Sequence, residues 1–468
     1  MKSDIFDRIA SQRGKGKETV RGWDFGLFTY IYERLYPYFN VQLYTPYENA
    51  FPTSDRAIIG AGLKGIAKLE DFWTDKKNVD IFTFFDFYMG ALQDDLREQG
   101  FAVFGPGKRG ELLERDRLHF KKVLRDVKLP VIPFDICVGV NENSPEIRKK
   151  LAESLKEYGI TKKPDELLPL REYLFGLPEG TKRIIKASCF RGDVETEPHE
   201  EYEDTKQWLD ETAMKLGVQA DEQLFICEFP IEGKCEPGRD DVISDGVFGT
   251  WGMVGWEEKG SALIGKWFKR ESIPAILKYI DDALIPLFRE YRYRGLYCME
   301  SRVSEKAQYG MPAGTCWPLD ICTRAGSPSS EVLIKSIDNF PEVVKMVAQG
   351  KEPKIELKDQ YAAILKFHTS RLSNNYDVPI SYPKEIADSV MVRNKHVHGN
   401  GQIYSISQDK GDNAGAVVAT GSTIDEACNK CLELIEQVKC KCMEYDQNAF
   451  DKIKGYMKEG ERWKIDMT

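Results

Sequence analysis

The sequence lacks any apolar stretch of the length that crosses a membrane. Its first residues, MKSDIFDRIASQRGKGK, also lack the apolar core of a signal peptide. We therefore expect a cytoplasmic protein whose 11 cysteines are free thiols in a reducing compartment. A surplus of basic residues is absent too, because the formal net charge is -9. This balance argues against a nucleic-acid partner, although it leaves room for a small basic patch.

The cysteines lack the glycine-rich turns that usually surround zinc-binding pairs. Cys428-x-x-Cys431 and Cys440-x-Cys442 lie within residues 424–445, where the apolar residues recur at helical spacing. We interpret these cysteines mostly as small core residues, with a zinc site as the minor alternative. The sequence also shows no obvious catalytic triad, which favours a reaction that needs no side-chain nucleophile.

Length and composition indicate an ordinary globular protein of several domains. The chain has 468 residues, of which 42% are hydrophobic and 30% charged. Strand and helix patterns alternate up to Gly107, which predicts a parallel α/β domain over residues 1–110. A polar hinge near residue 350 precedes a small α+β domain over 346–468. The large region between them, 111–345, divides into subdomains at 181–260 and 261–345.

Residues Gly60 to Gly65, GAGLKG, match the spacing G-x-G-x-x-G of dinucleotide-binding loops. That fingerprint requires a good strand before the glycines, and the segment before Gly60 is short and turn-like. We therefore favour a glycine-rich loop before a helix at residues 66–73, and rank an NAD-dependent oxidoreductase well below the alternatives given later. Residues 246–260 are also glycine-rich, and with two tryptophans they suggest a loop that lines a pocket.

Charged residues near strand ends are the candidates for chemistry. Lys186 ends the apolar segment IIK, where a lysine is costly unless an anion balances it; a phosphate and a carboxylate are both suitable partners. Asp86 ends another strand and serves either a ligand or the next helix as a cap. Arg117 and Lys121 share a face of a charged helix over 111–129, which we interpret as a solvated face.

Glu300 and Asp320 each end a short apolar segment, and Arg324 and a Gly-Ser-Pro turn follow Asp320. Two carboxylates delivered by adjacent strands are suited to Mg²⁺, which binds one or two carboxylates together with substrate phosphates. A structural ion-pair network is the alternative for these charges. The segment LDICTRAGSP, residues 319–328, is therefore the centre of the predicted site.

The order of these segments resembles that of the ATP-grasp ligases, most closely the phosphoribosylamine–glycine ligase type. The resemblance spans roughly residues 75–345, with VDIFTFFD, LLERDRLHFKK, RIIKASCFRG, ICEF, YRGLYCME and LDICTRAGSP in sequence, and a weaker echo over about 400–445. It implies an α/β and α+β multidomain protein: an ATP-grasp fold with an N-terminal parallel α/β domain and a small C-terminal α+β domain.

The resemblance also implies roles for single residues. Lys186 and Arg324 would be catalytic, with Arg324 stabilising the transferred phosphoryl group or acyl phosphate. Glu300 and Asp320 would bind Mg²⁺ or Mn²⁺. Eight residues would contact ATP: Arg117, Lys186, Arg191, Gly192, Glu228, Phe229, Ile231 and Glu236.

The family resemblance implies a ligase that joins a small-molecule carboxylate to an amine through an acyl phosphate, releasing ADP and phosphate. The sequence departs from the family pattern at two places, one at a metal-binding position and one in the substrate loop. Cys322 stands where the family has a metal-binding asparagine, and the family's substrate loop is distorted at Gly249 to Gly255. We therefore expect substrates other than phosphoribosylamine. The alternative hypothesis is a catalytically inactive, nucleotide-binding scaffold or regulatory protein, and the sequence allows a homodimer.

Overall fold

The computed structural model describes residues 17–46, 58–86, 89–189, 196–199, 202–408, 411–465 and 467. The chain forms two compact units. Unit 1 consists of residues 1–111, 235–300 and 322–468, and unit 2 consists of residues 112–234 and 301–321. Among the described residues, no helix combines the length and the apolar character needed to span a membrane. The three-domain division expected from the sequence stays a prediction.

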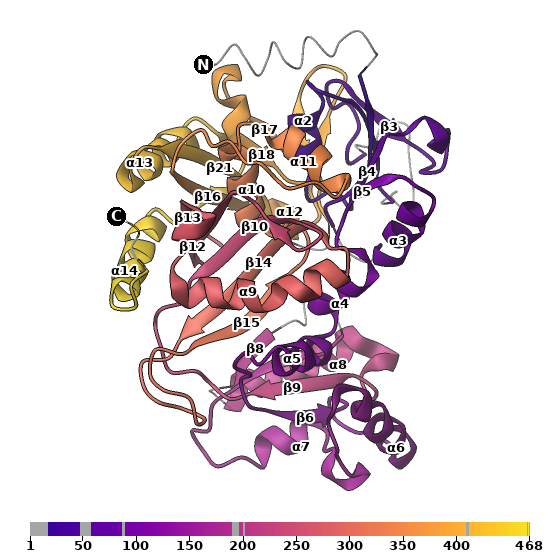
Figure 1. Ribbon diagram of the computed structural model, residues 1–468, viewed down its shortest axis with the longest axis vertical. Coiled ribbons are helices and arrows are strands. Elements are labelled where there is room, and N and C mark those ends of the chain that lie inside the picture. Colours follow the sequence, from indigo (N-terminus) through magenta and orange to yellow (C-terminus); the bar gives the residue numbers. More distant parts are fainter. Residues whose placement is uncertain are drawn as a thin grey trace. The chain divides into compact units, whose positions relative to one another are not determined.

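A five-stranded parallel sheet opens unit 1, as the sequence predicts for this region (Figure 1). Its order is β3-β2-β1-β4-β5, so the chain runs outward from β1 to β3 and then returns to β4 on the other side of β1. The strands and helices are β1 (Thr19–Trp23), α2 (Thr29–Leu35), β2 (Asn40–Tyr44), β3 (Ile66–Leu69), β4 (Ile81–Phe84), α3 (Gly90–Glu98), β5 (Ala102–Phe104) and α4 (Gly107–Arg115).

The expected helix at residues 66–73 is wrong, because its first four residues form β3 and pair with β2 from Ile66 to Leu69. Gly62 and Gly65 both have a φ of 73°, which favours glycine in tight turns. A Cβ on Gly62 would also lie 1.8 Å from the Val397 carbonyl oxygen. The glycines of GAGLKG thus serve a turn and a close backbone approach, and a strand follows them where a dinucleotide fingerprint requires a helix.

A larger antiparallel sheet forms the centre of unit 1, in the order β14-β10-β12-β13-β16-β21-β18. The residues at 246–260, expected to form a loop, are largely strand: β12 pairs with β13 from Trp251 to Glu258, and Met253 and Trp256 are buried. The elements are β10 (Gly238–Ser244), β11 (Val247–Phe248), β12 (Trp251–Glu258), β13 (Ala262–Lys269), α9 (Ala275–Glu290), β14 (Arg294–Val303), α10 (Ser329–Ser336), α11 (Phe340–Ala348), β16 (Tyr361–Thr369), β18 (Val390–Val392) and β21 (Asn413–Gly421).

The last part of unit 1 adds a small antiparallel sheet, in the order β19-β20-β17-β22, and flanking helices. Cys428 and Cys431 are buried on α13, and the Cys431 thiol lies 3.0 Å from the Ala363 carbonyl oxygen, which confirms that these two are core residues. The prediction is wrong for the other pair, since Cys440 is only partly buried and Cys442 is exposed. The elements are α12 (Ser370–Ser373), β17 (Val378–Ser381), β19 (Lys395–Val397), β20 (Ile403–Ser405), α13 (Ile424–Ile435), β22 (Lys439–Cys440), β23 (Met443–Glu444) and α14 (Ala449–Glu461).

Unit 2 is built on a four-stranded antiparallel sheet, in the order β6-β9-β7-β8, with helices on both faces. Alternate residues of the strands enter two separate apolar cores: Ile136 and Ile226 pack near α5 and α6, whereas Ile185 and Phe225 pack near α7 and α8. The elements are α5 (Arg117–Asp126), β6 (Phe134–Val138), α6 (Pro145–Ser154), α7 (Leu170–Phe175), β7 (Arg183–Ala187), β8 (Thr196–His199), α8 (Tyr202–Leu216), β9 (Leu224–Glu228) and β15 (Cys316–Cys322).

Candidate functional site

Lys186 lies at the centre of a buried group of charged side chains in unit 2. It is the fourth residue of β7, and only 5% of its surface is exposed. Its Nζ atom lies 3.1 Å from Asp320 Oδ2 and 3.2 Å from Glu228 Oε2, and it donates a hydrogen bond of 3.2 Å to the Leu319 carbonyl oxygen. Burial alone would lower the pKa of Lys186, but the carboxylates of Asp320 and Glu228 raise it above its ordinary value. Lys186 is therefore a fixed positive charge.

Lys121 joins this group from α5. The Asp116 side chain caps the helix by accepting a hydrogen bond of 3.0 Å from the His119 amide, and this start places Arg117 and Lys121 on the inner face. The Lys121 ammonium forms an ion pair with Glu228, and both residues are at most 3% exposed. The interpretation of this helix face as solvated is therefore wrong for both Arg117 and Lys121, which are buried.

Glu228, the last residue of β9, connects the two lysines. Burial raises the pKa of its carboxyl group, but Lys121 and Lys186 outweigh burial and hold that pKa below its ordinary value. Burial has the stronger influence on Lys121, whose pKa is lowered although Glu228 opposes the change. Glu228 is therefore an ionised carboxylate that holds two ammonium groups in place.

Arg117 and Asp320 complete the group. The Arg117 guanidinium donates a hydrogen bond of 2.6 Å to the Ala187 carbonyl oxygen, and its Nε lies 3.5 Å from Asp320 Oδ1. The Asp320 side chain is 27% exposed, whereas the other four side chains are at most 5% exposed. Three cations and two carboxylates leave one net positive charge beside a partly exposed carboxylate, which is an arrangement suited to an anion accompanied by a metal ion. We call these five residues the unit 2 charge cluster.

Phe229 and Ile231 follow β9 in the segment expected to contact the nucleotide base. The Arg183 guanidinium lies 4.0 Å from the centre of the Phe229 ring, and the Tyr309 ring lies 5.9 Å from it. Ile231 packs in an apolar cluster with Ile132 and Trp317. The chain beyond Glu228 is thus held in place by aromatic and apolar contacts.

The remaining predicted site residues fall elsewhere. Glu236, Glu300 and Arg324 belong to unit 1: Glu236 lies 4.0 Å from Lys259, Glu300 stands opposite Gly238 in the β14–β10 pairing, and the Arg324 guanidinium donates a hydrogen bond of 3.0 Å to the Ala325 carbonyl oxygen. Arg191 and Gly192 lie outside the described residues. In the described ranges, no set of three His, Cys, Asp or Glu side chains is grouped to hold a metal ion.

The structure thus brings together four predicted residues, Arg117, Lys186, Glu228 and Asp320, and adds Lys121. The spacing of Lys121 from Arg117, four residues along one helix, was a usable signal, because residues at i and i+4 point in the same direction. What was missing was the knowledge that this face packs on β9.

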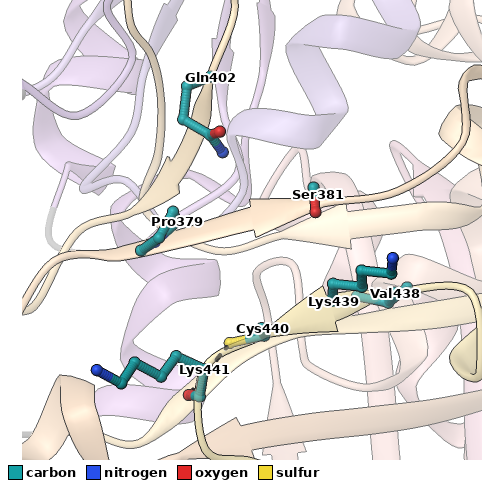
Figure 2. A pocket seen from close by; sticks show the side chains of 7 residues that line it. All are labelled: Pro379, Ser381, Gln402, Val438, Lys439, Cys440 and Lys441. Carbon is teal, nitrogen blue, oxygen red and sulfur yellow. Dashed lines mark hydrogen bonds between the residues drawn. The ribbon is translucent and has the colours of Figure 1, made fainter.

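Figure 2 shows a separate surface hollow of about 620 Å³ in unit 1, between β17 and β22. In this view the Lys439 and Lys441 side chains extend in opposite directions, so their charges do not converge. Burial raises the pKa of the Cys440 thiol to about 11, which keeps it protonated and weakly nucleophilic at neutral pH. The hollow therefore offers neither a binding site for an anion nor an activated thiol. Its lining consists of Pro379, Ser381, Gln402, Val438, Lys439, Cys440 and Lys441.

No family model matches the sequence. Among solved structures, phosphoribosylamine–glycine ligase from Thermotoga maritima superposes with a TM-score of 0.58 at 15% identity, covering 91% of this chain and 98% of the ligase. The biotin carboxylase domain of 2-oxoglutarate carboxylase from Hydrogenobacter thermophilus, in complex with MgADP, ADP and bicarbonate, gives a TM-score of 0.59 at 12% identity and covers 95% of this chain and 98% of that domain.

L-amino acid ligase from Bacillus licheniformis is also similar, with a TM-score of 0.52 at 13% identity over 92% of this chain and all of the ligase. These proteins share one architecture over nearly their whole lengths, although few residues are identical. The likeness establishes the architecture that the motifs of the sequence indicated. The chain has the ATP-grasp fold.

Proposed function

We propose that the protein is an ATP-dependent ligase that joins a small-molecule carboxylate to an amine through an acyl phosphate, releasing ADP and phosphate. The observation that carries this proposal is the unit 2 charge cluster, in which Lys186 is buried between Asp320 and Glu228. The fold similarity to two ligases and a carboxylase domain supports the same reaction class.

The cluster is suited to hold the phosphates of a nucleotide. Arg117, Lys121 and Lys186 present three cations, and Glu228 holds both ammonium groups in position, so it acts as a positioning residue. A preorganised set of cations in a site with little water stabilises developing phosphoryl charge without reorganising during the reaction. The segment with Phe229 and Ile231 would contact the base, and Glu236, Arg191 and Gly192 would contribute the remaining nucleotide contacts.

The fold implies a divalent metal ion, and the residues present are suited to one. Asp320 offers a carboxylate that is partly exposed and lies beside two cations, Arg117 and Lys186. Together with Glu300 it would hold Mg²⁺, with Mn²⁺ as an alternative ion, and the metal would supply positive charge to the phosphates. Arg324 would hold the acyl phosphate. In this scheme the chain binds and orients both substrates and excludes water, and the amine performs the displacement.

The test is ADP formation from MgATP with a panel of carboxylates and amines. Replacing Lys186 by Met removes a charge but keeps the length of the side chain, and we expect turnover to fall at least a hundredfold. The control is Lys122→Met, since Lys122 is partly exposed on α5, the helix that carries Lys121, and forms a surface ion pair with Asp126. Full turnover in both the Lys186→Met and the Asp320→Asn variants would overturn the proposal.

The catalytically inactive alternative is favoured by one observation: Cys322 occupies a position where the family resemblance expects a metal-binding asparagine. Its thiol lies 3.8 Å from the Arg324 carbonyl oxygen, so it contacts the turn that carries Arg324. The two candidates differ in one measurement. An inactive nucleotide-binding protein would be stabilised by MgATP but would release no phosphate with any carboxylate and amine in the panel.

A further inference from the structure

Two aspartates lie at the carboxyl edge of the parallel sheet in unit 1. Asp24 follows β1 directly, and Asp86 comes two residues after β4. These neighbouring strands are the point at which the chain reverses its direction across the sheet, since β2 and β3 lie on one side of β1 and β4 lies on the other. In open parallel sheets, ligands bind outside the carboxyl ends of the strands at this reversal.

The Asp24 carboxylate is only half satisfied. Its Oδ1 accepts hydrogen bonds from the Gly26 amide at 2.6 Å and the Phe28 amide at 3.3 Å. Its Oδ2 is buried and has no hydrogen-bond partner among the described residues, while the residue as a whole is 0% exposed. A buried acceptor without a donor costs roughly 1–3 kcal/mol, and more when it is charged. Such an atom calls for a donor that the described residues do not supply.

The surroundings of Asp24 are acidic. Burial is the main cause that raises the pKa of Asp24, and the nearby charge of Asp86 adds to it, so that the pKa reaches about 7. Burial is the main cause that raises the pKa values of the Tyr30 and Tyr32 hydroxyl groups, and the charge of Asp24 adds to both shifts. The arrangement repels phosphate and carboxylate groups and attracts a cation.

The acid pair also lies beside the loop that carries Arg324. The Ala325 amide donates a hydrogen bond of 2.8 Å to the carbonyl oxygen of Phe85, the residue before Asp86. The Tyr30 hydroxyl lies 3.0 Å from Ser330 Oγ, at the beginning of α10. Within unit 1, therefore, the edge of the parallel sheet and the segment proposed to hold the acyl phosphate are in direct contact.

We propose that Asp24 and Asp86 bind the cationic nitrogen group, an ammonium or a guanidinium, of the amine co-substrate. This inference rests on the proposed ligase function and adds the substrate class: a positively charged amine, in place of one that carries a phosphate group. A cation supplies the donor that Asp24 Oδ2 requires and balances the charge of both carboxylates. In this proposal the parallel sheet binds the cationic nitrogen group of the amine, and unit 2 binds the nucleotide.

The test is binding of small probes to the full chain by calorimetry, without ATP. The probes are 1,4-diaminobutane, L-lysine and L-arginine as cations, with glycerol 3-phosphate, L-glutamate and Mg²⁺ as comparisons. We expect at least one organic cation to bind tenfold or more tightly than the anions, and the Asp24→Asn and Asp86→Asn variants each to weaken it at least tenfold. Asp95→Asn, an exposed change on α3, is the matched control and should have no effect.

Asn at position 24 keeps the oxygen that holds the Gly26 and Phe28 amides, and Asp86→Asn leaves that turn intact. Equal binding of cations and anions, binding of Mg²⁺ alone, or unchanged binding in both variants would overturn the assignment. Stabilisation of the unaltered protein by MgATP is measured in parallel. If MgATP stabilises the protein and no organic cation binds, only this inference fails; if MgATP has no effect, the proposed function fails.

Discussion

Asp24 gives the clearest dependence of stability on pH at the scale of single residues. Its pKa is about 7 in the folded protein and about 4 in an unfolded chain, so between these pH values the folded state keeps a proton that the unfolded state has released. The free energy of unfolding therefore falls as pH rises through this window, by up to about 4 kcal/mol from this group. Asp86, Tyr30 and Tyr32 are charged or titratable groups that interact electrostatically with Asp24.

We expect the Asp24→Asn variant to lose this dependence. Its stability relative to the unaltered protein should increase by roughly 2–4 kcal/mol between pH 4.5 and pH 7.5 in urea denaturation. Asp240 and Asp241, whose pKa values burial raises to about 6, contribute the same sign in both proteins and cancel in the difference. A constant difference across this range would show that Asp24 titrates normally in the folded state.

At the scale of elements, β1 depends on a glycine that no motif marks. A Cβ on Gly22 would lie 2.0 Å from the ring of Tyr32, which packs across β1 from α2. We expect Gly22→Ala to cost about 1–3 kcal/mol or more in unfolding free energy, because the ring has to move out of a packed core. The control is Gly455→Ala on α14, where nothing lies within 4 Å of the new Cβ; there the change should add about 0.5–1 kcal/mol. Thermal or urea unfolding of both variants is the measurement, and equal stability would contradict the packing argument.

Elements with a strong period were predictable from the sequence. The strands β4 and β5 and the helix α3 between them lie before Gly107, where the alternating patterns predict strands and helices. β1 was not predicted, because its five residues run directly into the apolar pattern of α2. β3 was predicted to be a helix, because four residues are too few to show a period of two. β12 was hidden by its glycines, which weaken a strand but are tolerated where neighbouring strands pair on both sides.

The candidate site was also predictable only in part from the sequence. Lys186 was identified because a charged residue at the end of an apolar segment is costly without a partner, and Asp320 because a carboxylate at the end of such a segment is suited to a metal ion. Arg117 was assigned to the site only through the family resemblance. Lys121 was not identified, because burial of a helix face depends on the sheet behind it. Asp24 was missed with β1, since a carboxylate at a strand end is recognisable only when the strand itself is recognised.

At the scale of the whole molecule, all five residues of the charge cluster lie in unit 2. Binding of MgATP should therefore protect the amides of Arg117–Asp126, Arg183–Ala187 and Leu224–Glu228 from hydrogen exchange, by tenfold or more at saturating ligand. The strands of the parallel sheet, β1 to β5, should change much less. The Lys186→Met variant is the control and should lose the protection, whereas protection confined to the parallel sheet would contradict the placement of the nucleotide.

The path of the chain between the two units has a mechanical consequence. Unit 2 is built from two segments of the chain, and each segment is joined at both ends to residues of unit 1. Thr19 and Ile465 also belong to unit 1. A force that pulls on those two residues is therefore carried first by unit 1. Unit 2 bears load only after the strands and helices of unit 1 have separated. In a single-molecule stretching experiment, unit 2, in which we propose that the nucleotide binds, would be the last to extend, and MgATP would raise the force of the later step without changing the first.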